Sequence, residues 1–534
     1  MILPRRTIRA DKLQANIYKT RDEAGEAAAF DAGQFIRKQL KEKESVNIVF
    51  AAAPSQYETL KYLTKQPGIE WERVVAFHMD EYCGLPNDSQ QSFGYFLKSA
   101  IFEKLPFKKV HLISDATGDK CDSYAELLRN NKPDLVLLGI GENAHIAFND
   151  PHVADFNDKN IIKKVALDEI CRKQQVHDAC FATLSEVPTH AYTLTVPILM
   201  SAKKLICSVP AASKAKAVVH TLYSPVSEKY PATIMRTHDD AVMYLDADSG
   251  VKGMFKTSII TDEVSQNLEE VCKFADDFGL SAVEIRSVED TALENMSDEQ
   301  IERYKETINR YGLNISAVCT SLFKCNLSEY QNSSLQRAIE ICNKFGCKIL
   351  RGFSFYKDKN FSKEAFADLL KSYAKELEKN DLYLVLENEP SQNLSSAAAV
   401  AEVIAQVKSP RVKVLWDPGN DLYDTVEVPY PAGYQAAKGD ILHIHIKDAK
   451  SIKGKMTGVA FGEGEVDYNG QLKELIKDRF VGYLVLETHY RKGAKLSDEI
   501  LLRPMGSDFS KNGKESSEEC LRNMFESLKR ALIG

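Results

Sequence analysis

At 534 residues the chain is longer than a single hydrophobic core usually supports, so at least two domains are expected. Hydrophobic residues make up 44% of the sequence and charged residues 27%, a balance that excludes a fibrous or largely disordered protein. The net charge of −7 excludes a broad basic surface for nucleic acid, but it allows a local basic pocket for one phosphate.

The first residues lack the apolar run of a signal peptide, because Asp11, Lys12 and Gln14 follow closely on the start. No window approaches the roughly 18 consecutive apolar residues that cross a bilayer. The 11 cysteines are scattered without a CxxC pair, which favours reduced thiols used in packing. We therefore expect a cytoplasmic protein that acts on a small molecule, with neither nucleic acid nor membrane as a partner.

Residues 1–246 are predicted to form an α/β domain with an open, mostly parallel, Rossmann-like sheet. Short apolar runs alternate with amphipathic segments, a pattern typical of parallel strands covered by helices on both faces. The candidate strands are residues 46–50, 74–77, 110–113, 134–138 and 204–207. Residues 247–254 are polar, contain glycine and show no periodicity, so we expect a linker there.

Two segments that carry reactive side chains follow strands in this domain. Residues 77–86 read FHMDEYCGLP and include Asp80, and residues 139–151 read GIGENAHIAFNDP and include His145 and Asp150. Each segment begins where a strand ends, which places Asp80 and His145 near the ligand edge of a parallel sheet. Taken alone, an acid and a histidine would more often be an ordinary structural pair.

Together these segments resemble glucosamine-6-phosphate deaminase, and more distantly 6-phosphogluconolactonase, over roughly residues 30–246. The resemblance continues through residues 187–195, 213–215 and 225–234. It implies a base that moves a proton between C2 and C1, a histidine that assists ring opening, two residues that orient this histidine, and a phosphate-binding lysine. These roles fall on Asp80, on His145, on Asn143 with Asp150, and on Lys214, respectively.

The sequence departs from this family at several positions. The family has aspartate, glycine and glutamate where this chain has Asn143, Ala144 and Asp150. Residues 51–55 read AAAPS in place of a glycine-rich phosphate loop, so only Ser55 remains as a side-chain donor to a phosphate. Two interpretations follow: a sugar-phosphate deaminase or isomerase, or a regulatory module that binds a sugar phosphate without turning it over.

Residues 255–534 are predicted to form a (β/α)8 TIM barrel. Eight strand-like runs alternate with helical patterns in this region, as the barrel requires. The candidate strands are residues 256–260, 282–286, 315–320, 349–354, 382–387, 412–417, 441–447 and 483–487.

The last four candidate strands carry polar residues at their C-terminal ends, where TIM barrels do their chemistry. These residues are Glu387, Asp417, His445 and Glu487. Three carboxylates packed together repel one another unless a cation neutralises them. We therefore predict one divalent metal ion, which the sequence does not resolve among Mn, Mg, Co and Zn. His443 is predicted to point to the opposite side of its strand from His445 and to serve in packing.

The second domain resembles the xylose-isomerase-like TIM barrels, particularly the sugar-phosphate isomerases and epimerases. The resemblance is carried by TDEVS at 261–265, VEIR at 283–286, LENEP at 386–390, WDPGN at 416–420, HIKD at 445–448 and GEGEVD at 462–467. It implies that Glu387, Asp417, His445 and Glu487 hold the metal, and that Glu387 and Glu487 also act as acid and base. The reaction would pass through an enediolate.

Three cationic residues of the barrel, Arg286, Arg351 and Lys447, are expected to bind a phosphate or sugar hydroxyls, with an ion-pair role equally open. The sequence as a whole predicts a bifunctional carbohydrate enzyme that catalyses consecutive steps on a sugar or sugar phosphate. A homo-oligomer is compatible with both resemblances. A phosphodiesterase acting on damaged DNA, which also occurs among such barrels, is disfavoured by the acidic net charge and the single four-ligand set.

Overall fold

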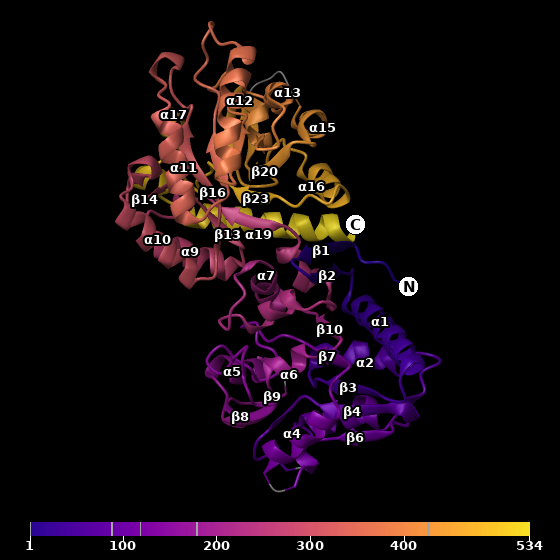
Figure 1. The fold of residues 1–534 in the computed structure, drawn as a ribbon. Helices are drawn as coiled ribbons and strands as arrows, with labels where there is room; N and C mark the ends of the chain where they lie inside the picture. The colour runs from indigo at the N-terminus through magenta and orange to yellow at the C-terminus, as the bar shows by residue number, and fades with distance from the viewer. Residues whose placement is uncertain (1, 87–88, 118, 178–179, 424–427, 503) are drawn as a thin grey trace. The chain divides into compact units, whose positions relative to one another are not determined.

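The computed structural model describes residues 2–86, 89–117, 119–177, 180–423, 428–502 and 504–534 (Figure 1). It divides into two compact units, one reaching to Met254 and one running from Phe255 to Leu532. Both units are of the α/β class. Within the described ranges, none of the helices combines the length and the apolar character needed to traverse a lipid bilayer.

The first unit is built on an eight-stranded sheet in which every neighbouring pair is parallel except β1 with β2. The fully apolar strands lie in its interior, which explains their continuous hydrophobic sequences. This confirms the predicted open, mostly parallel sheet. In spatial order the strands are β1 (Arg6–Ala10), β2 (Leu13–Ile17), β11 (Ala241–Leu245), β10 (Lys204–Val209), β7 (Leu135–Leu138), β3 (Val46–Phe50), β4 (Val74–His78) and β6 (Lys109–His111).

A smaller antiparallel sheet in the same unit has the order β5 (Asp80–Tyr82), β9 (His190–Leu194) and β8 (Ile162–Ala166). Helix α1 (Arg21–Glu42) begins at Thr20, whose hydroxyl accepts the N–H of Glu23. Its buried face is rich in alanine and packs against the main sheet. The other helices are α2 (Tyr57–Leu63), α3 (Phe93–Leu97), α4 (Lys120–Asn130), α5 (Glu169–His177), α6 (Val196–Met200) and α7 (Ala215–Tyr223).

The segment expected to be a linker is helical. Asp246 caps the short helix α8 (Ala247–Gly250) by accepting the N–H of Ser249 at 2.8 Å, and a 3-10 turn (Val251–Gly253) follows. Gly250 packs against the side chain of Ile17, to which an added Cβ would lie 2.8 Å away. Gly250, one of the glycines that suggested a linker, therefore serves close packing.

The second unit contains eight parallel strands in the order expected of a TIM barrel. An isolated parallel bridge between Ile260 and Glu284 lies at the seam between the first two strands. This confirms the predicted barrel. In chain order the strands are β12 (Lys256–Ile259), β13 (Ala282–Ile285), β16 (Asn314–Leu322), β17 (Ile349–Gly352), β18 (Tyr383–Glu387), β19 (Val412–Trp416), β20 (Ile441–Ile446) and β23 (Tyr483–Leu486).

The helices of the barrel carry clear start and stop signals. In α9 (Leu268–Phe278), the side chain of Asn267 accepts two N–H groups of the first turn, and Gly279 ends the helix with a φ of +69°. The buried residues of α9 recur at helical spacing. The other helices are α10 (Asp298–Arg310), α11 (Ser333–Phe345), α12 (Lys363–Lys379), α13 (Ala397–Val407), α14 (Pro418–Tyr423), α15 (Tyr434–Ala437), α16 (Tyr468–Lys477), α17 (Asp498–Leu502), α18 (Gly506–Ser510) and α19 (Gly513–Ile533).

A hairpin follows strand β20 and contains the HIKD motif's aspartate. In this hairpin, β21 (Asp448–Ile452) pairs with β22 (Lys455–Val459). The Asp448 carboxylate accepts backbone N–H groups of Gly462 and Gly464, each at 2.9 Å, and of Val466 at 3.3 Å. These hydrogen bonds join the HIKD motif at 445–448 to the GEGEVD motif at 462–467 and hold the loop after β22 in place.

Replacing Gly464 with alanine is expected to lower the barrel's free energy of unfolding by about 1–3 kcal/mol, because overpacking displaces the Asp448 anchor. An added Cβ would lie 1.9 Å from Asp448 Oδ1 and 2.6 Å from the carbonyl oxygen of Ala449. Denaturant unfolding measures the effect. Gly439→Ala is the matched control, since nothing lies within 4 Å of a Cβ there. Equal stability of the two variants would contradict a stabilising role for the hydrogen bonds of Asp448.

Candidate active sites

Four neighbouring parallel strands of the first unit deliver predicted site residues to one cavity. Ser55 follows β3, Asp80 follows β4, His145 follows β7 and Lys214 follows β10. Because these strands are adjacent in the sheet, their C-terminal ends meet at one edge. All four residues line a cavity of ≈ 130 Å³.

Asp80 is suited to proton transfer. Its side chain is 5% exposed, and its Oδ1 has no hydrogen-bond partner among the described residues. Burial, with the nearby charge of Glu81, raises the pKa of Asp80 well above its ordinary value. A carboxylate with a raised pKa is a stronger base than an exposed one.

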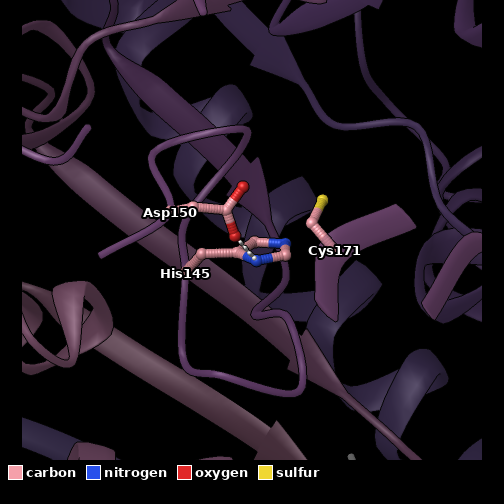
Figure 2. Close-up of side chains that lie close together, drawn as sticks. All are labelled: His145, Asp150 and Cys171. Atoms are coloured by element: carbon pink, nitrogen blue, oxygen red, sulfur yellow. Dashed lines mark ion pairs between the residues drawn. The ribbon is translucent and has the colours of Figure 1, made fainter. Parts of the chain in front are cut away.

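Asn143, His145 and Asp150 form a connected group, of which Figure 2 shows the His145–Asp150 pair. Asp150 Oδ1 lies 2.8 Å from His145 Nδ1, and the Asn143 side-chain amide donates to the same oxygen at 2.9 Å. Asn143 Oδ1 accepts the backbone N–H of His145 at 3.1 Å. The shorter aspartate therefore reaches the histidine, and Asn143 orients both partners without adding charge.

The charge of Asp150 depends on its neighbours. Burial alone would raise its pKa, but the interactions with His145, Asn143 and Cys171 outweigh burial and lower the pKa below its ordinary value. Asp150 therefore carries a full negative charge beside the imidazole at neutral pH. One carboxylate supplies this charge where the resembled family uses two.

Cys171 and Gln175 belong to this region but were not predicted from the sequence. Cys171 is fully buried, and its sulfur lies within 4.8 Å of ligand atoms of His145 and Asp150 (Figure 2). Burial and the charge of Asp150 raise the pKa of Cys171, so the thiol stays protonated. Gln175 lines the cavity one helical turn further along α5. The four-residue spacing of Cys171 and Gln175 indicates one face of a helix, but nothing in the sequence distinguishes Cys171 from the ten other cysteines.

In the barrel, the four predicted metal ligands converge. Glu387, Asp417, His445 and Glu487 are all buried, and one ligand atom of each lies within 4.8 Å of the others. They come from the ends of four strands that are neighbours in the barrel.

A hydrogen-bond network holds together the two segments that carry Glu387 and Asp417. Asn388 Oδ1 accepts the N–H of Asp417 at 2.8 Å, and its amide donates to Asp421 Oδ1 at 2.9 Å. The indole N–H of Trp416 donates to the other oxygen of Asp421 at 2.9 Å. Asn420 donates to the carbonyl oxygen of Asn388 at 2.9 Å. The LENEP and WDPGN motifs are therefore one interlocked structure.

The three cationic residues are paired with the carboxylates. Lys447 Nζ lies 2.8 Å from Asp417 Oδ2, Arg286 Nη1 lies 2.6 Å from Glu487 Oε1, and Arg351 pairs with Glu387. Of the two roles left open by the sequence, the contacts show the ion pair. Buried side chains therefore supply positive charge to these three carboxylates even without a metal ion.

His443 and His445 both point at Glu284, so the prediction that His443 faces the opposite side was wrong. Residues two apart on a strand share a face. His443 Nε2 lies 2.6 Å from Glu284 Oε2, and His445 Nε2 lies 2.9 Å from Glu284 Oε1. His445 Nδ1 faces Glu487 at 3.2 Å and Glu387 at 3.4 Å. Burial alone would lower the pKa of His445, but these carboxylates raise it well above its ordinary value.

A cavity of ≈ 310 Å³ in the barrel is lined by Arg286 and Arg351, but not by the four clustered ligands. Lys324 also lines it, and Lys324 and Arg351 each lie 4.6 Å from the centroid of the Phe353 ring. These contacts hold two cations on the cavity wall.

Comparison with known proteins identifies relatives of the first unit. Residues 19–244 match the family described as glucosamine-6-phosphate isomerases/6-phosphogluconolactonase. The glucosamine-6-phosphate deaminases of Bacillus cereus (strain B4264) and Bacillus thuringiensis (strain Al Hakam) are each 30% identical over 236 residues, covering 44% of this chain and 86% of each relative. The chain belongs to the glucosamine-6-phosphate isomerase/6-phosphogluconolactonase family.

In the second unit, residues 272–503 match the family described as xylose isomerase-like TIM barrel. Among solved structures, a monomeric glucosamine-6-phosphate deaminase is 24% identical, covers 44% of this chain and 98% of its own, and gives a TM-score of 0.41. A xylose isomerase-like TIM barrel/4-hydroxyphenylpyruvate dioxygenase fusion protein is 16% identical, covers 50% of this chain and 42% of its own, and gives a TM-score of 0.38.

Ala144 occupies a position where the glucosamine-6-phosphate deaminase resemblance expects glycine, and it keeps a left-handed backbone with φ of +62°. Two alanines that line the cavity, Ala147 and Ala211, also have positive φ, at +52° and +87°. Such conformations strain any residue with a Cβ, and they tend to cluster at functional sites.

Ala144→Gly is expected to raise the free energy of unfolding of the first unit by roughly 0.5–1 kcal/mol, because relief of left-handed strain exceeds glycine's larger unfolded-state entropy. Thermal unfolding measures the change. Ala125→Gly, inside helix α4, is the control and should destabilise instead. A loss of stability in both variants would show that the left-handed backbone carries no strain.

Proposed function

We propose that the chain is a bifunctional carbohydrate enzyme. Its first unit would act as an amino-sugar-phosphate deaminase or isomerase, and its barrel as a metal-dependent sugar or sugar-phosphate isomerase or epimerase. The observation that carries the proposal is the convergence of Asp80, His145, Ser55 and Lys214 on one cavity. The unit that contains this cavity is 30% identical to curated glucosamine-6-phosphate deaminases.

In the first unit, Asp80 would take the C2 proton and return it at C1. Its burial, raised pKa and unpartnered oxygen suit a base that must remove a weakly acidic proton. His145, held by the charged Asp150, would move a proton at the ring oxygen during opening. Lys214 and Ser55 would bind the phosphate at the strand-end loops.

In the barrel, Glu387, Asp417, His445 and Glu487 would hold one Mn, Mg, Co or Zn ion. Three carboxylates and one imidazole, all buried and with ligand atoms within 4.8 Å of one another, fit such an ion. When bound, the ion would polarise a sugar carbonyl and stabilise an enediolate. Glu387 and Glu487 would transfer the proton, and Arg286, Arg351 and Lys447 would hold these carboxylates in place.

A second candidate makes the first unit a regulatory module that binds a sugar phosphate without catalysis. Three features favour it: the neutral Asn143 beside His145, the alanine at 144, and the loop at 51–55 without glycine. Under the catalytic candidate alone, a ketose phosphate released by the first unit would be a natural substrate for the barrel.

Proton exchange followed by NMR in deuterated water tests both candidates. The full chain is given amino-sugar phosphates, ketose phosphates or free ketoses, with Mn²⁺ and again with EDTA. EDTA-resistant exchange on an amino-sugar phosphate would support a catalytic first unit, and EDTA-sensitive exchange on a ketose would support the barrel reaction. Binding of an amino-sugar phosphate without exchange would favour the regulatory candidate.

A further inference from the structure

Glu284 is a fully buried carboxylate that receives four donors beneath the predicted metal ligands. Its Oε1 lies 2.9 Å from His445 Nε2 and accepts the Cys319 thiol at 2.7 Å. Its Oε2 lies 2.6 Å from His443 Nε2 and accepts the Ser316 hydroxyl at 3.2 Å.

We propose that Glu284 is a positioning residue that accepts the Nε2–H of His445 and thereby presents Nδ1 to Glu387 and Glu487. Glu284 Oε1 lies 2.9 Å from Nε2, and a carboxylate oxygen accepts, so Nε2 is the ring nitrogen that donates to Glu284. Nδ1 faces Glu487 at 3.2 Å and Glu387 at 3.4 Å, and it would become a ligand once a cation held by these carboxylates displaces its proton. Metal-binding histidines commonly use a carboxylate in this way to fix the tautomer and ring orientation. The role in metal binding rests on the proposed function, whereas the contact between Glu284 and His445 does not depend on it.

The position of Glu284 is itself fixed by three other strands. Ser316 on β16 contacts Ser258 on β12 at 2.7 Å between hydroxyl oxygens. His443 and His445 belong to β20, and Glu284 belongs to β13, beside the seam of the barrel. A polar chain therefore runs across the barrel interior and leaves the His445 ring little freedom to rotate.

Mn²⁺ titration by calorimetry tests the effect on binding. Glu284→Gln keeps the shape of the side chain but removes the charge, and it is expected to raise the Kd for Mn²⁺ about 10- to 100-fold. Glu269→Gln, which removes the charge of an exposed carboxylate that pairs with Arg310 at 2.8 Å, is the control and should leave the Kd unchanged. A folded Glu284→Gln variant that binds Mn²⁺ as tightly as the wild type overturns the proposal.

A second measurement does not depend on metal or on a variant of Glu284. In metal-free protein labelled with 15N-histidine, the Nε2–H of His445 is expected as a downfield, slowly exchanging proton, assigned by its loss in His445→Gln. Absence of this signal would overturn the positioning role. If the signal is present but the wild type binds no divalent ion, the proposed metal function fails while the role of Glu284 in fixing the ring stands.

Discussion

Asp80→Asn is expected to lower EDTA-resistant proton exchange at C2 by roughly 100- to 10,000-fold, because an amide cannot accept the proton that a positioned base removes. Exchange by the unmodified chain should rise with pH through the raised pKa of Asp80, since only the ionised form is a base. NMR exchange rates measured at several pH values check both statements. Asp122→Asn, an exposed acid in the first turn of α4, is the control.

Asp80→Asn should also change how the free energy of unfolding depends on pH. The pKa of Asp80 is higher in the folded than in the unfolded chain, so folding favours the protonated form. Its stabilising contribution is present below the unfolded pKa and is lost as the pH rises through the folded pKa. The Asp80→Asn variant should therefore lose less stability on going from acidic to neutral pH. An unchanged exchange rate in this variant would remove Asp80 from the proposed mechanism.

Glu487→Gln is expected to abolish EDTA-sensitive exchange and to lower the barrel's unfolding free energy by about 3–5 kcal/mol, because it removes one carboxylate from a buried ion-pair cluster. Glu487 lies 2.6 Å from Arg286, 3.2 Å from His445 and 3.3 Å from Lys447. Denaturant unfolding in EDTA separates the ion-pair effect from any loss of metal. Proton exchange measured with saturating Mn²⁺ reports the loss of the barrel reaction itself.

Glu389→Gln is the matched control for Glu487→Gln. Glu389 lies just beyond strand β18 and pairs with Lys324 at 3.3 Å, and its side chain is 20% exposed. Both side chains of this pair are partly exposed, so the control should lower the unfolding free energy clearly less than Glu487→Gln does. Similar losses in both variants would show that the buried cluster is not specially dependent on Glu487.

The sequence predicted the fold class and the convergence of the barrel acids for clear physical reasons. Apolar runs of strand length that alternate with helical patterns permit few architectures. A residue such as Asp417 at the end of a parallel strand can only lie at one rim of a barrel. The same reasoning brought Asp80 and His145 to one edge of the open sheet.

The partners of these residues could not be read in the same way. Arg286 and Glu487 are far apart in the sequence, and neither pattern nor spacing shows that they meet. The VEIR motif marked Glu284, but its burial under two histidines depends on how β13 and β20 face each other across the barrel. Pairwise contacts between distant strands are a property of the closed structure, whereas periodicity is a property of each segment.

The buried thiol beside His145 has a consequence for chemical modification. Alkylating agents and peroxide react with thiolates, whereas Cys171 is fully buried and its pKa is raised by burial and by Asp150. The protein can therefore keep a sulfur atom next to its proposed ring-opening histidine without making that histidine's surroundings sensitive to oxidants. In a variant that lacks the partly exposed Cys83, Cys121 and Cys180, loss of first-unit activity on treatment with such reagents would report transient opening of helix α5.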